Sequence, residues 1–535
     1  MKNQTIKPFL PGNYILNKQI SRPRYLFGSR FVLDSGADNI WDCAVLDRKK
    51  VIETIDRRQL GEKGIHCPPG AREWGYTFFI PDDQKDGSGN YAMGGFKTPP
   101  KSREEALSVI RERIIKHYSL SELKEWESCP GHYLWQHYSC EWGCTSVCSE
   151  VGESISSTQT HIAFCRGAAK QYKIPWGLQF SFWQQGRIND YTGDAVWGVH
   201  SKPNGGHSPS LYKRTFLAAY MGGASHFYPE ACAVINFCKE LDEDGCYKLS
   251  PVGEMSRRLN RFIADNRNIG INYTPFGIVL DYYHGMFSGD RQITKRKAFQ
   301  VFDYNAGDDM TYNLFDKFFP SSWVTFGANE ATYQVNGPYG DTCDVLLQNA
   351  PQEVLDSYPC LIMTGDINLS EEEKKRYAAY VKKGGTLILN TAYLSFFPEY
   401  EAEYNGFRRC DITDEEGTVI VYGPDYMLSG LDEILCEQLL RLVPFRLSEQ
   451  VEYLVNVTEG SLILTLINND GYYYNHTTGE MVDSGKEKKL TVSYTGGAQV
   501  KAVKELWTAE VFPAADTLEI SVPPGEAAIL EFSLV

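Results

Sequence analysis

The stretch CLIMTGDINLSEEEKKRYAAYVKKGGTLILN, residues 360–390, contains two short apolar runs separated by a charged segment. The runs CLIMTG and TLILN have the length and composition of central strands in a parallel sheet. Between them, Ser370 and Glu373 have the spacing of a capping box, acids fill the first turn, and lysines and glycines close the last turn. The stretch therefore predicts a strand–helix–strand unit of an α/β sheet.

The same pattern extends over residues 271–445. The runs FGIVLD (276–281) and CDVLLQ (343–348) are equally short and apolar, and they predict two further central strands. The region lacks the glycine fingerprint of dinucleotide-binding folds and the phosphate-binding P-loop. It also lacks a cysteine on a turn between a strand and a helix, which argues against amidotransferase chemistry. We therefore expect a small open α/β domain without a catalytic motif of its own.

Residues 1–270 also alternate between helical and extended patterns. Such alternation over about 250 residues is typical of a parallel sheet, and the commonest closed form at that length is the (β/α)8 TIM barrel. Helices are expected over 102–118, 131–143, 155–173, 210–221 and 250–265, and strands over 145–149, 176–183 and 223–230, with weaker strand patterns near 29–34, 63–67 and 76–81.

Residues 446–535 have an all-β pattern. The segments VEYLVNV, SLILTLINN and KKLTVSYT alternate with a period of two, and turn residues lie between them. We expect a small antiparallel β-sandwich. The predicted organisation is a barrel over 1–270, an α/β domain over 271–445 and the sandwich over 446–535, which suits a chain of 535 residues.

Charge and hydropathy exclude several classes of partner. The net charge of −15 argues against a surface for nucleic acid or anionic membranes, which needs clustered lysine and arginine. No stretch approaches the ~20 apolar residues of a membrane-spanning helix, and the first residues contain no apolar run of signal-peptide length. We therefore expect a cytoplasmic protein without nucleic-acid or membrane partners.

The fourteen cysteines are scattered without paired spacing. Cys165 and Cys360 sit in apolar runs, which is typical of reduced, buried thiols. Cys140, Cys144 and Cys148 lie closer together, but their spacing matches neither the zinc nor the iron–sulfur patterns. We expect no metal and no cofactor; a metal or redox enzyme built on these three cysteines is kept as an alternative that metal analysis tests.

Two glutamates follow predicted barrel strands. Glu150 comes after TSVCS and Glu230 after GASHFYP, and residues just past the strand ends of a TIM barrel face its active site. Two converging carboxylates are the minimum apparatus for glycoside hydrolysis, since one protonates the leaving oxygen and the other stabilises or traps the developing cation. A carboxylate separation of ~5–5.5 Å indicates a retaining enzyme and a wider one, ~6.5–9.5 Å, an inverting enzyme.

Further residues are candidates for substrate binding. Aromatic rings stack on the apolar faces of sugars, and long polar loops at the strand ends of a barrel commonly bind substrate. Glu153 has an alternative role in favouring the start of the following helix, and Glu141 has one as a solvated helix residue. The candidates are Glu141, Trp142, Glu153, Trp183, Tyr191, Trp197 and His200.

The order of domains resembles the glycoside hydrolase family 42 β-galactosidases. FGIVLDYYHG resembles the strand that opens their flavodoxin-like trimerisation domain, residues 360–391 resemble its late strand–helix–strand unit, and LILTLINNDG resembles the start of their C-terminal sandwich. The resemblance covers the second half of the chain well and the barrel in outline. It implies a flavodoxin-like middle domain and a homotrimer.

The resemblance also implies roles for the two acids. In that family the acid/base glutamate follows the fourth barrel strand and the nucleophile follows the seventh, so Glu150 would be the acid/base and Glu230 the nucleophile. The chain departs from the family in two ways: Ser149 stands where the family has asparagine, and only one strand, 176–183, lies between the acids where the family has two. A strand within 184–208 would restore the count; without it the roles exchange, or the second acid is Glu153 or Glu141.

The sequence therefore predicts a glycoside hydrolase that cleaves a small oligosaccharide or glycoside by retention. A non-catalytic carbohydrate-binding or scaffold protein with the same aromatic cleft is the alternative.

Overall fold

The computed structural model describes most of the chain. The described residues are 32–33, 46–61, 72–73, 96, 98–120, 127–129, 135–152, 158–184, 187–189, 191–192, 201–202, 204–230, 232–285, 297–299, 301–320, 333–406 and 408–535.

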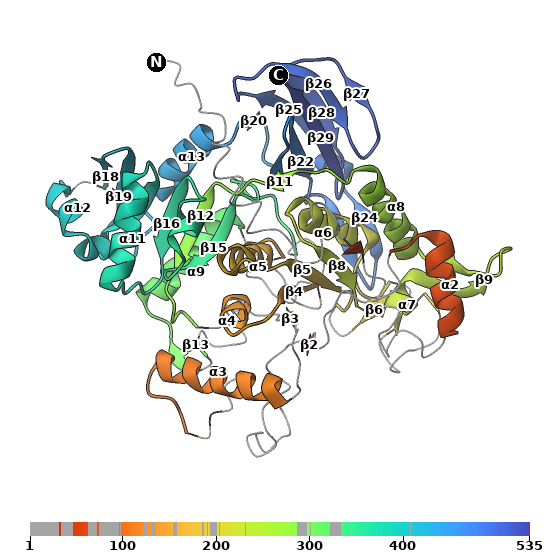
Figure 1. Cartoon of the computed structure of the whole chain (residues 1–535). Coiled ribbons are helices and arrows are strands. Elements are labelled where there is room, and N and C mark those ends of the chain that lie inside the picture. The colour runs from red at the N-terminus through yellow and green to blue at the C-terminus, as the bar shows by residue number, and fades with distance from the viewer. Residues whose placement is uncertain are drawn as a thin grey trace.

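The first sheet has six parallel strands in the order β2–β3–β4–β5–β8–β1 (Figure 1). The strands follow chain order from β2 to β8, and β8 then pairs with β1. This is the cyclic order of a barrel, whereas a doubly wound sheet reverses its order at a switch point. The strands are β1 (Val32–Leu33), β2 (Arg72–Glu73), β3 (Glu127–Cys129), β4 (Ser146–Gly152), β5 (Trp176–Ser181) and β8 (His226–Pro229).

This sheet is strongly curved. Glu127 on β3 and His226 on β8 are three inter-strand spacings apart, which would separate their Cα atoms by at least about 14 Å in a flat sheet. Each side chain reaches only about 5 Å from its Cα. Their atoms nevertheless meet, with Oε2 of Glu127 lying 2.9 Å from Nε2 of His226. The sheet must therefore curve toward the face that carries these two residues, as a barrel wall does.

The expected eight-stranded, closed barrel is not confirmed. The described residues give six strands, and among them no pairing joins β1 to β2 to close the ring. β1 falls within the expected strand at 29–34, whereas the segments 63–67 and 76–81 lie outside the described residues.

Helices connect these strands. α6 begins after Ser208, whose hydroxyl accepts a hydrogen bond from the backbone of Leu211, and α8 begins after Ser250, which caps Gly253 in the same way. The helices are α2 (Arg48–Arg58), α3 (Arg103–Leu120), α4 (Trp135–Glu141), α5 (Thr158–Tyr172), α6 (Pro209–Met221), α7 (Cys232–Asn236) and α8 (Pro251–Asp265). Outside the main sheet lie the parallel pair β6 (Ile188–Asn189) and β7 (Ser201–Lys202) and the hairpin β9 (Phe237–Leu241) and β10 (Tyr247–Leu249).

The second sheet has the order β15–β12–β16–β17–β19–β18, with β18 antiparallel at one edge. Its parallel strands, numbered along the chain, have the order 2-1-3-4-5 of flavodoxin-like sheets. The four expected strands are present: β12 (Phe276–Leu280), β15 (Cys343–Leu347), β16 (Cys360–Thr364) and β17 (Thr386–Asn390), joined by β18 (Arg409–Asp414) and β19 (Gly417–Tyr422). The remaining elements here are β13 (Lys297–Ala298), β14 (Phe302–Asp303), α9 (Ala306–Phe318), α10 (Gln352–Leu355), α11 (Glu371–Lys382), η3 (Thr391–Phe396), α12 (Pro398–Glu403) and α13 (Leu431–Leu442).

Helix α11 confirms the capping box expected from the sequence. The Ser370 hydroxyl accepts from the backbone of Glu373, and the Glu373 carboxylate accepts from the backbone of Ser370.

Two antiparallel sheets form the C-terminal region, whose strands from β20 onward are blue in Figure 1, and β11 from earlier in the chain joins one of them. One has the order β11–β21–β22–β29–β26–β27 and the other β20–β25–β28, and residues of both share one apolar core, as in a sandwich. The elements are β11 (Ile271–Asn272), β20 (Phe445–Leu447), β21 (Glu452–Val457), β22 (Ser461–Ile467), β23 (Tyr472–Asn475), β24 (Gly479–Val482), η4 (Ser484–Lys486), β25 (Lys488–Tyr494), β26 (Val500–Glu505), β27 (Val511–Phe512), β28 (Thr517–Val522) and β29 (Ala527–Leu534).

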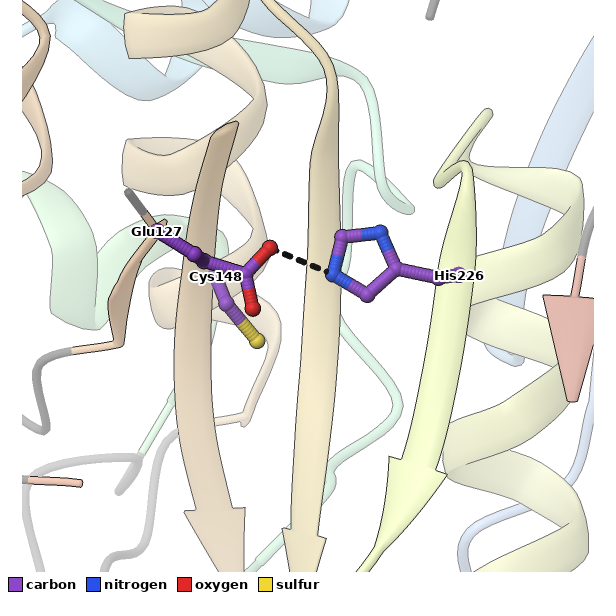
Figure 2. A group of neighbouring side chains, drawn as sticks. All are labelled: Glu127, Cys148 and His226. Carbon is purple, nitrogen blue, oxygen red and sulfur yellow. Dashed lines mark ion pairs between the residues drawn. The ribbon is translucent and has the colours of Figure 1, made fainter. Parts of the chain in front are cut away.

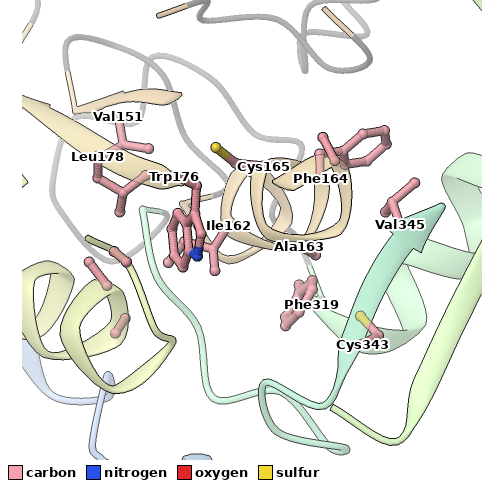
Figure 3. Packing of buried hydrophobic residues seen from close by; sticks show 14 of the residues in the cluster. Val151, Ile162, Ala163, Phe164, Cys165, Trp176, Leu178, Phe319, Cys343 and Val345 are labelled. Carbon is pink, nitrogen blue, oxygen red and sulfur yellow. The ribbon is translucent and has the colours of Figure 1, made fainter. Parts of the chain in front are cut away.

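Helix α5 lies between the first two sheets. Figure 3 shows Ile162 of α5 beside Trp176 of β5, on the side of the first sheet, and Phe164 on the side of Val345 in β15. This double packing explains why nearly every residue of α5 is buried. Among the described residues, no helix is both long and apolar enough to cross a membrane.

Candidate functional site

The first sheet has two chemically different faces. Val147 and Val151 of β4, Leu178 of β5 and Phe227 of β8 belong to the apolar core that the surrounding helices complete. Because successive residues of a strand point to opposite faces, the residues between them point away from the helices, toward the concave side of the sheet.

The concave face is polar. Cys148 on β4 pairs with Gly177 on β5, and Gly177 pairs with His226 on β8. Figure 2 shows the side chains of Cys148 and His226 on one side of these strands, together with Glu127. Laterally paired residues of neighbouring strands share a face, so this row fixes the concave face on each of the three strands.

Glu150 lies on the concave face, two residues beyond Cys148. The sequence predicted a strand that ends at Ser149 with Glu150 just past it, but β4 continues to Gly152. Glu150 is therefore within the strand, and its side chain is completely buried. The predicted boundary was wrong because an acid was taken as the end of a strand, whereas the inside of this sheet accommodates polar side chains.

Glu230 lies at the carboxyl end of β8, where the sequence placed it. Its backbone N–H donates to the carbonyl of Phe180 at 2.9 Å and so extends the pairing of β5 with β8 by one residue. Its Oε2 accepts a hydrogen bond of 2.6 Å from the hydroxyl of Ser181. Ser181 is four residues beyond Gly177 and shares its face, so the half-buried carboxylate of Glu230 is held at the concave side.

The two glutamates share this face, on the strands that flank β5. Glu150 pairs with Gln179, and Gln179 pairs with Tyr228, which precedes Glu230 by two residues. Two strand spacings and a two-residue rise separate their Cα atoms by about 12 Å in a flat sheet. The curvature of the sheet brings concave side chains closer than this, as the contact between Glu127 and His226 demonstrates.

The strand count between the acids differs from the family pattern. β5 pairs directly with both β4 and β8, so no strand from 184–208 lies between them; β6 and β7 form a separate pair. Moreover, β8 pairs with β1. Among the described strands β8 therefore has β5 on one side and β1 on the other, and no count to a seventh strand can be made. The roles that the resemblance implied therefore have no support from strand position.

Two of the proposed substrate-binding residues lie near the amino-terminal ends of the strands, opposite the carboxyl ends where Glu230 stands. Glu141 and Trp142 stand at the end of α4 just before β4 begins, whereas Glu230 stands where β8 ends. Trp142 is buried and stacks on Tyr138, with 5.8 Å between ring centroids. Glu141 is exposed and accepts hydrogen bonds from the hydroxyl of Tyr282 at 2.9 and 2.8 Å. Both residues are thereby separated from the site.

The other predicted residues fall into two groups. Trp183 is half-buried just beyond the end of β5, and its backbone N–H lies 3.4 Å from the hydroxyl of Ser181. Tyr191 is half-buried, and its backbone N–H donates to the carbonyl of Val234 at 3.1 Å. The rest lie outside the described residues: Glu153, Trp197 and His200.

The sequence did not single out Glu127, Ser181 or His226. Glu127 and His226 form a buried contact beside Cys148 on the concave face, one layer below Glu150 (Figure 2). Ser181 holds Glu230. In β5 and β8 the polar residues alternate with apolar ones, a pattern typical of a strand with one solvent-exposed face, whereas β3 (Glu127–Cys129) is too short for a pattern.

Charged side chains meet at the switch point of the second sheet. Ligands of open α/β sheets bind beyond the strand ends where the strand order reverses, here between β12 and β16. At this point Asp281 accepts from the backbone N–H of Asp366 at 2.9 Å and lies 3.2 Å from Nδ1 of His284. Asp308 lies 3.1 Å from the same nitrogen and is held by Arg103. Among the described residues, these four side chains are thus engaged with one another at the switch point.

Solved structures that are similar to this chain include β-galactosidases. The crystal structure of β-galactosidase from Bacillus circulans sp. alkalophilus aligns with a TM-score of 0.50 at 11% identity, over 81% of this chain and 67% of that chain. A β-galactosidase from the Antarctic haloarchaeon Halorubrum lacusprofundi gives 0.47 at 12% identity over 97% and 81%. A catalytic mutant of Gan42B, a GH42 β-galactosidase from G. stearothermophilus, gives 0.45 at 13% identity over 80% and 68%.

No family model matches the chain, and no curated protein does. The likeness to the Bacillus enzyme, which rests on structure at low sequence identity, shows a GH42-like fold. It confirms the resemblance at the level of the fold.

Proposed function

We propose that this chain is a glycoside hydrolase that uses Glu150 and Glu230. The observation that carries the proposal is their common position on the concave face of a curved parallel sheet, on strands that flank β5. Glycoside hydrolysis needs two carboxyl groups within one sugar-sized site. The similar fold of a β-galactosidase makes β-galactosides the first substrates to test.

The surroundings of the two acids assign different roles. Glu230 is half-buried and accepts a hydrogen bond from Ser181, which stabilises the ionised carboxylate that a nucleophile needs. Glu150 is completely buried, and burial disfavours the charged form of a carboxyl group, as a proton donor requires. This division agrees with the roles that the family resemblance implied, although it rests on environment and not on strand number.

The proposed reaction has two steps. Glu230 attacks the anomeric carbon while Glu150 gives its proton to the leaving oxygen, so the glycosidic bond breaks as the glycosyl–Glu230 ester forms. Glu150, now ionised, takes a proton from water as that water attacks the anomeric carbon, which breaks the ester bond and releases the Glu230 carboxylate. The sugar leaves with its anomeric configuration retained.

The first experiment is a panel of aryl glycosides with the full-length protein. We expect release of the aryl alcohol by the wild type, and a loss of about a hundredfold to about ten-thousandfold in Glu150→Gln and Glu230→Gln. Glu240→Gln, which alters an exposed glutamate on β9, serves as the matched control and keeps full activity. A folded wild type that hydrolyses no member of the panel overturns the proposal.

A second experiment separates the two roles. In Glu230→Ala, azide can enter the space of the lost carboxylate, attack the anomeric carbon and expel the aryl alcohol, giving a glycosyl azide. We expect azide to restore turnover in this variant with a product of inverted configuration. In Glu150→Ala we expect azide to attack the glycosyl–Glu230 ester and give an azide product of retained configuration. An inverted azide product from Glu150→Ala, with a retained one from Glu230→Ala, would exchange the two roles.

Complete burial of Glu150 favours one alternative, a carbohydrate-binding protein without catalysis. A carboxyl group that no substrate reaches cannot protonate a leaving oxygen. Calorimetric binding of a sugar by a wild type that hydrolyses none of its aryl glycosides would establish this alternative.

The homotrimer and the cytoplasmic location remain predictions from the sequence. Light scattering on the purified protein measures the mass of the assembly and tests the trimer directly.

A further inference from the structure

Glu127, Cys148 and His226 bring three different metal-binding atoms together. Their carboxylate oxygen, sulfur and imidazole nitrogen all lie within 4.8 Å of one another. The three side chains come from strands β3, β4 and β8 and are all buried. Figure 2 shows them converging on the concave face of the sheet. The cluster includes Cys148 but neither Cys140 nor Cys144, so it differs from the cysteine set considered in the sequence.

A neighbouring hydroxyl orients the histidine. The Oγ of Ser225 donates to the carbonyl of Trp176 at 2.9 Å and lies 2.8 Å from Nδ1 of His226. With its proton so engaged, Ser225 accepts the N–H of Nδ1. Nε2, which pairs with Glu127 in the absence of an ion, would lose its proton and present its lone pair to a bound cation. Metal-binding histidines are commonly fixed in this way through their second nitrogen.

The carboxylate is oriented as well. The hydroxyl of Ser146 donates to Oε2 of Glu127 at 2.6 Å. This oxygen is also the one that lies 2.9 Å from Nε2 of His226. Two tetrahedral zinc ligands at ordinary bond lengths stand about 3.3 Å apart. The nitrogen and oxygen therefore need to separate by only a few tenths of an ångström to hold an ion between them.

The backbone of β5 leaves room for the contact between Glu127 and His226. Gly177 of β5 lies between Cys148 and His226 in the register, and a Cβ on it would stand 2.3 Å from Nε2 of His226. Glycine at this position lets the imidazole lie over β5 and reach toward β4 and β3.

We propose that Glu127, Cys148 and His226 bind a zinc ion inside the first sheet. Thiolate, imidazole and carboxylate are the three ligand types of zinc, and three protein ligands leave one position for water. The charges balance, because the two charges of the ion offset one carboxylate and one thiolate in a buried site. The ion would tie β3, β4 and β8 together one layer below Glu150. The inference does not depend on glycoside hydrolysis.

The first test measures metal in the full-length wild type after dialysis against zinc and then against metal-free buffer. We expect zinc in a stoichiometric amount. Cobalt(II) introduced in place of zinc should give the charge-transfer absorption of a cobalt–thiolate bond, which reports the sulfur ligand without any enzyme assay. A folded wild type that retains no zinc and gives no such absorption overturns the proposal, and the three residues are then an ion-paired cluster alone.

The second test identifies the ligands. Cys148→Ser should abolish the cobalt–thiolate absorption, whereas Cys165→Ser should keep it, since Cys165 is equally buried but its thiol points to the carbonyls of Val147 and Gly177. Ser225→Ala should weaken zinc binding by about 10-fold to about 100-fold. Retention of the absorption in Cys148→Ser excludes this cysteine as the ligand. The zinc content and cobalt spectrum of the wild type do not depend on any variant. They can therefore overturn the proposal even if a variant fails to fold.

Discussion

The Nε2 of His226 lies 2.9 Å from Oε2 of Glu127, although β4 and β5 both run between the strands that carry them. The contact needs a curved sheet and an unobstructed path over β5, which Gly177 supplies. The contact between His226 and Glu127 thus depends on the absence of a side chain at Gly177 and on the curvature of the sheet.

Gly177→Ala should disrupt this arrangement. The added methyl group would lie 2.3 Å from the imidazole of His226, and overpacking of this kind costs about 1–3 kcal/mol. We expect a free energy of unfolding in urea that is lower by that amount. Gly460→Ala is the matched control, because a Cβ there has no heavy atom within 4 Å, and its stability should change by less than about 0.5 kcal/mol. Equal effects of the two substitutions would contradict the steric argument.

Ser181→Ala should weaken catalysis without removing a reacting group. The hydrogen bond from Ser181 to Glu230 is 2.6 Å long, and bonds to charged groups contribute about 1.5–3 kcal/mol. We expect kcat/KM to fall by about 10-fold to about 150-fold, and the acid limb of the pH–rate profile to move to higher pH, because Ser181 stabilises the ionised form. The pH profile distinguishes this role from simple loss of folded protein. Ser493→Ala, in the C-terminal sandwich, should leave the profile unchanged.

The local patterns of the middle domain were readable from the sequence. Its strands are buried on both faces and read as continuous apolar runs, and the caps of α11 depend on residues three positions apart. Such signals need no knowledge of the rest of the chain. The strands and the capping box were therefore predicted at nearly their observed positions.

The first sheet was harder to predict for two physical reasons. β1 and β2 are two residues long, too short for a periodic pattern. The concave face is polar, so β4 shows an acid at position 150 in the middle of a strand and was read as ending there. The contacts of this face also join residues far apart in sequence, such as Glu127 with His226, and no spacing rule finds them.

His284 should make stability depend on pH above neutrality. Burial alone lowers its pKa, but the charge of Asp281 and hydrogen bonds with Asp281 and Asp308 outweigh burial and raise the pKa to about 9, from 6.5. A raised pKa in the folded state means that the stabilisation is complete below about pH 6.5 and is lost as pH rises to about 9. The difference corresponds to about 3 kcal/mol.

The measurement is the free energy of unfolding in urea at about pH 6 and about pH 9.5. We expect the wild type to lose about 3 kcal/mol more than His284→Gln between the two pH values, because the variant has no imidazolium to titrate. A wild type and variant with parallel pH dependence would show that His284 does not carry a raised pKa. Asp308, whose pKa the hydrogen bonds of His284 and Arg103 hold well below its usual range against the effect of burial, contributes instead at acid pH.

Arg166 should be essential to the packing of α5 on the second sheet. It is buried, its guanidinium binds Asp341 at 2.7 and 3.0 Å, and its Nε donates to Asp344 at 2.5 Å. Arg166→Met leaves both carboxylates without this partner, and breaking a buried ion pair in this way costs about 3–5 kcal/mol. We expect a loss of that size in urea unfolding.

Lys173→Met provides the comparison for Arg166. Lys173 follows the end of α5 and pairs with Glu353 at 2.9 Å, but both side chains are about half exposed, at 51% and 47%. Water and salt screen such a pair, so the substitution should change stability by less than about 1 kcal/mol. If the two methionine variants unfolded at the same urea concentration, the buried network would not be what joins α5 to β15. A larger effect of Arg166→Met, persisting at high salt, would follow from burial, because screening by salt weakens exposed pairs far more than buried ones.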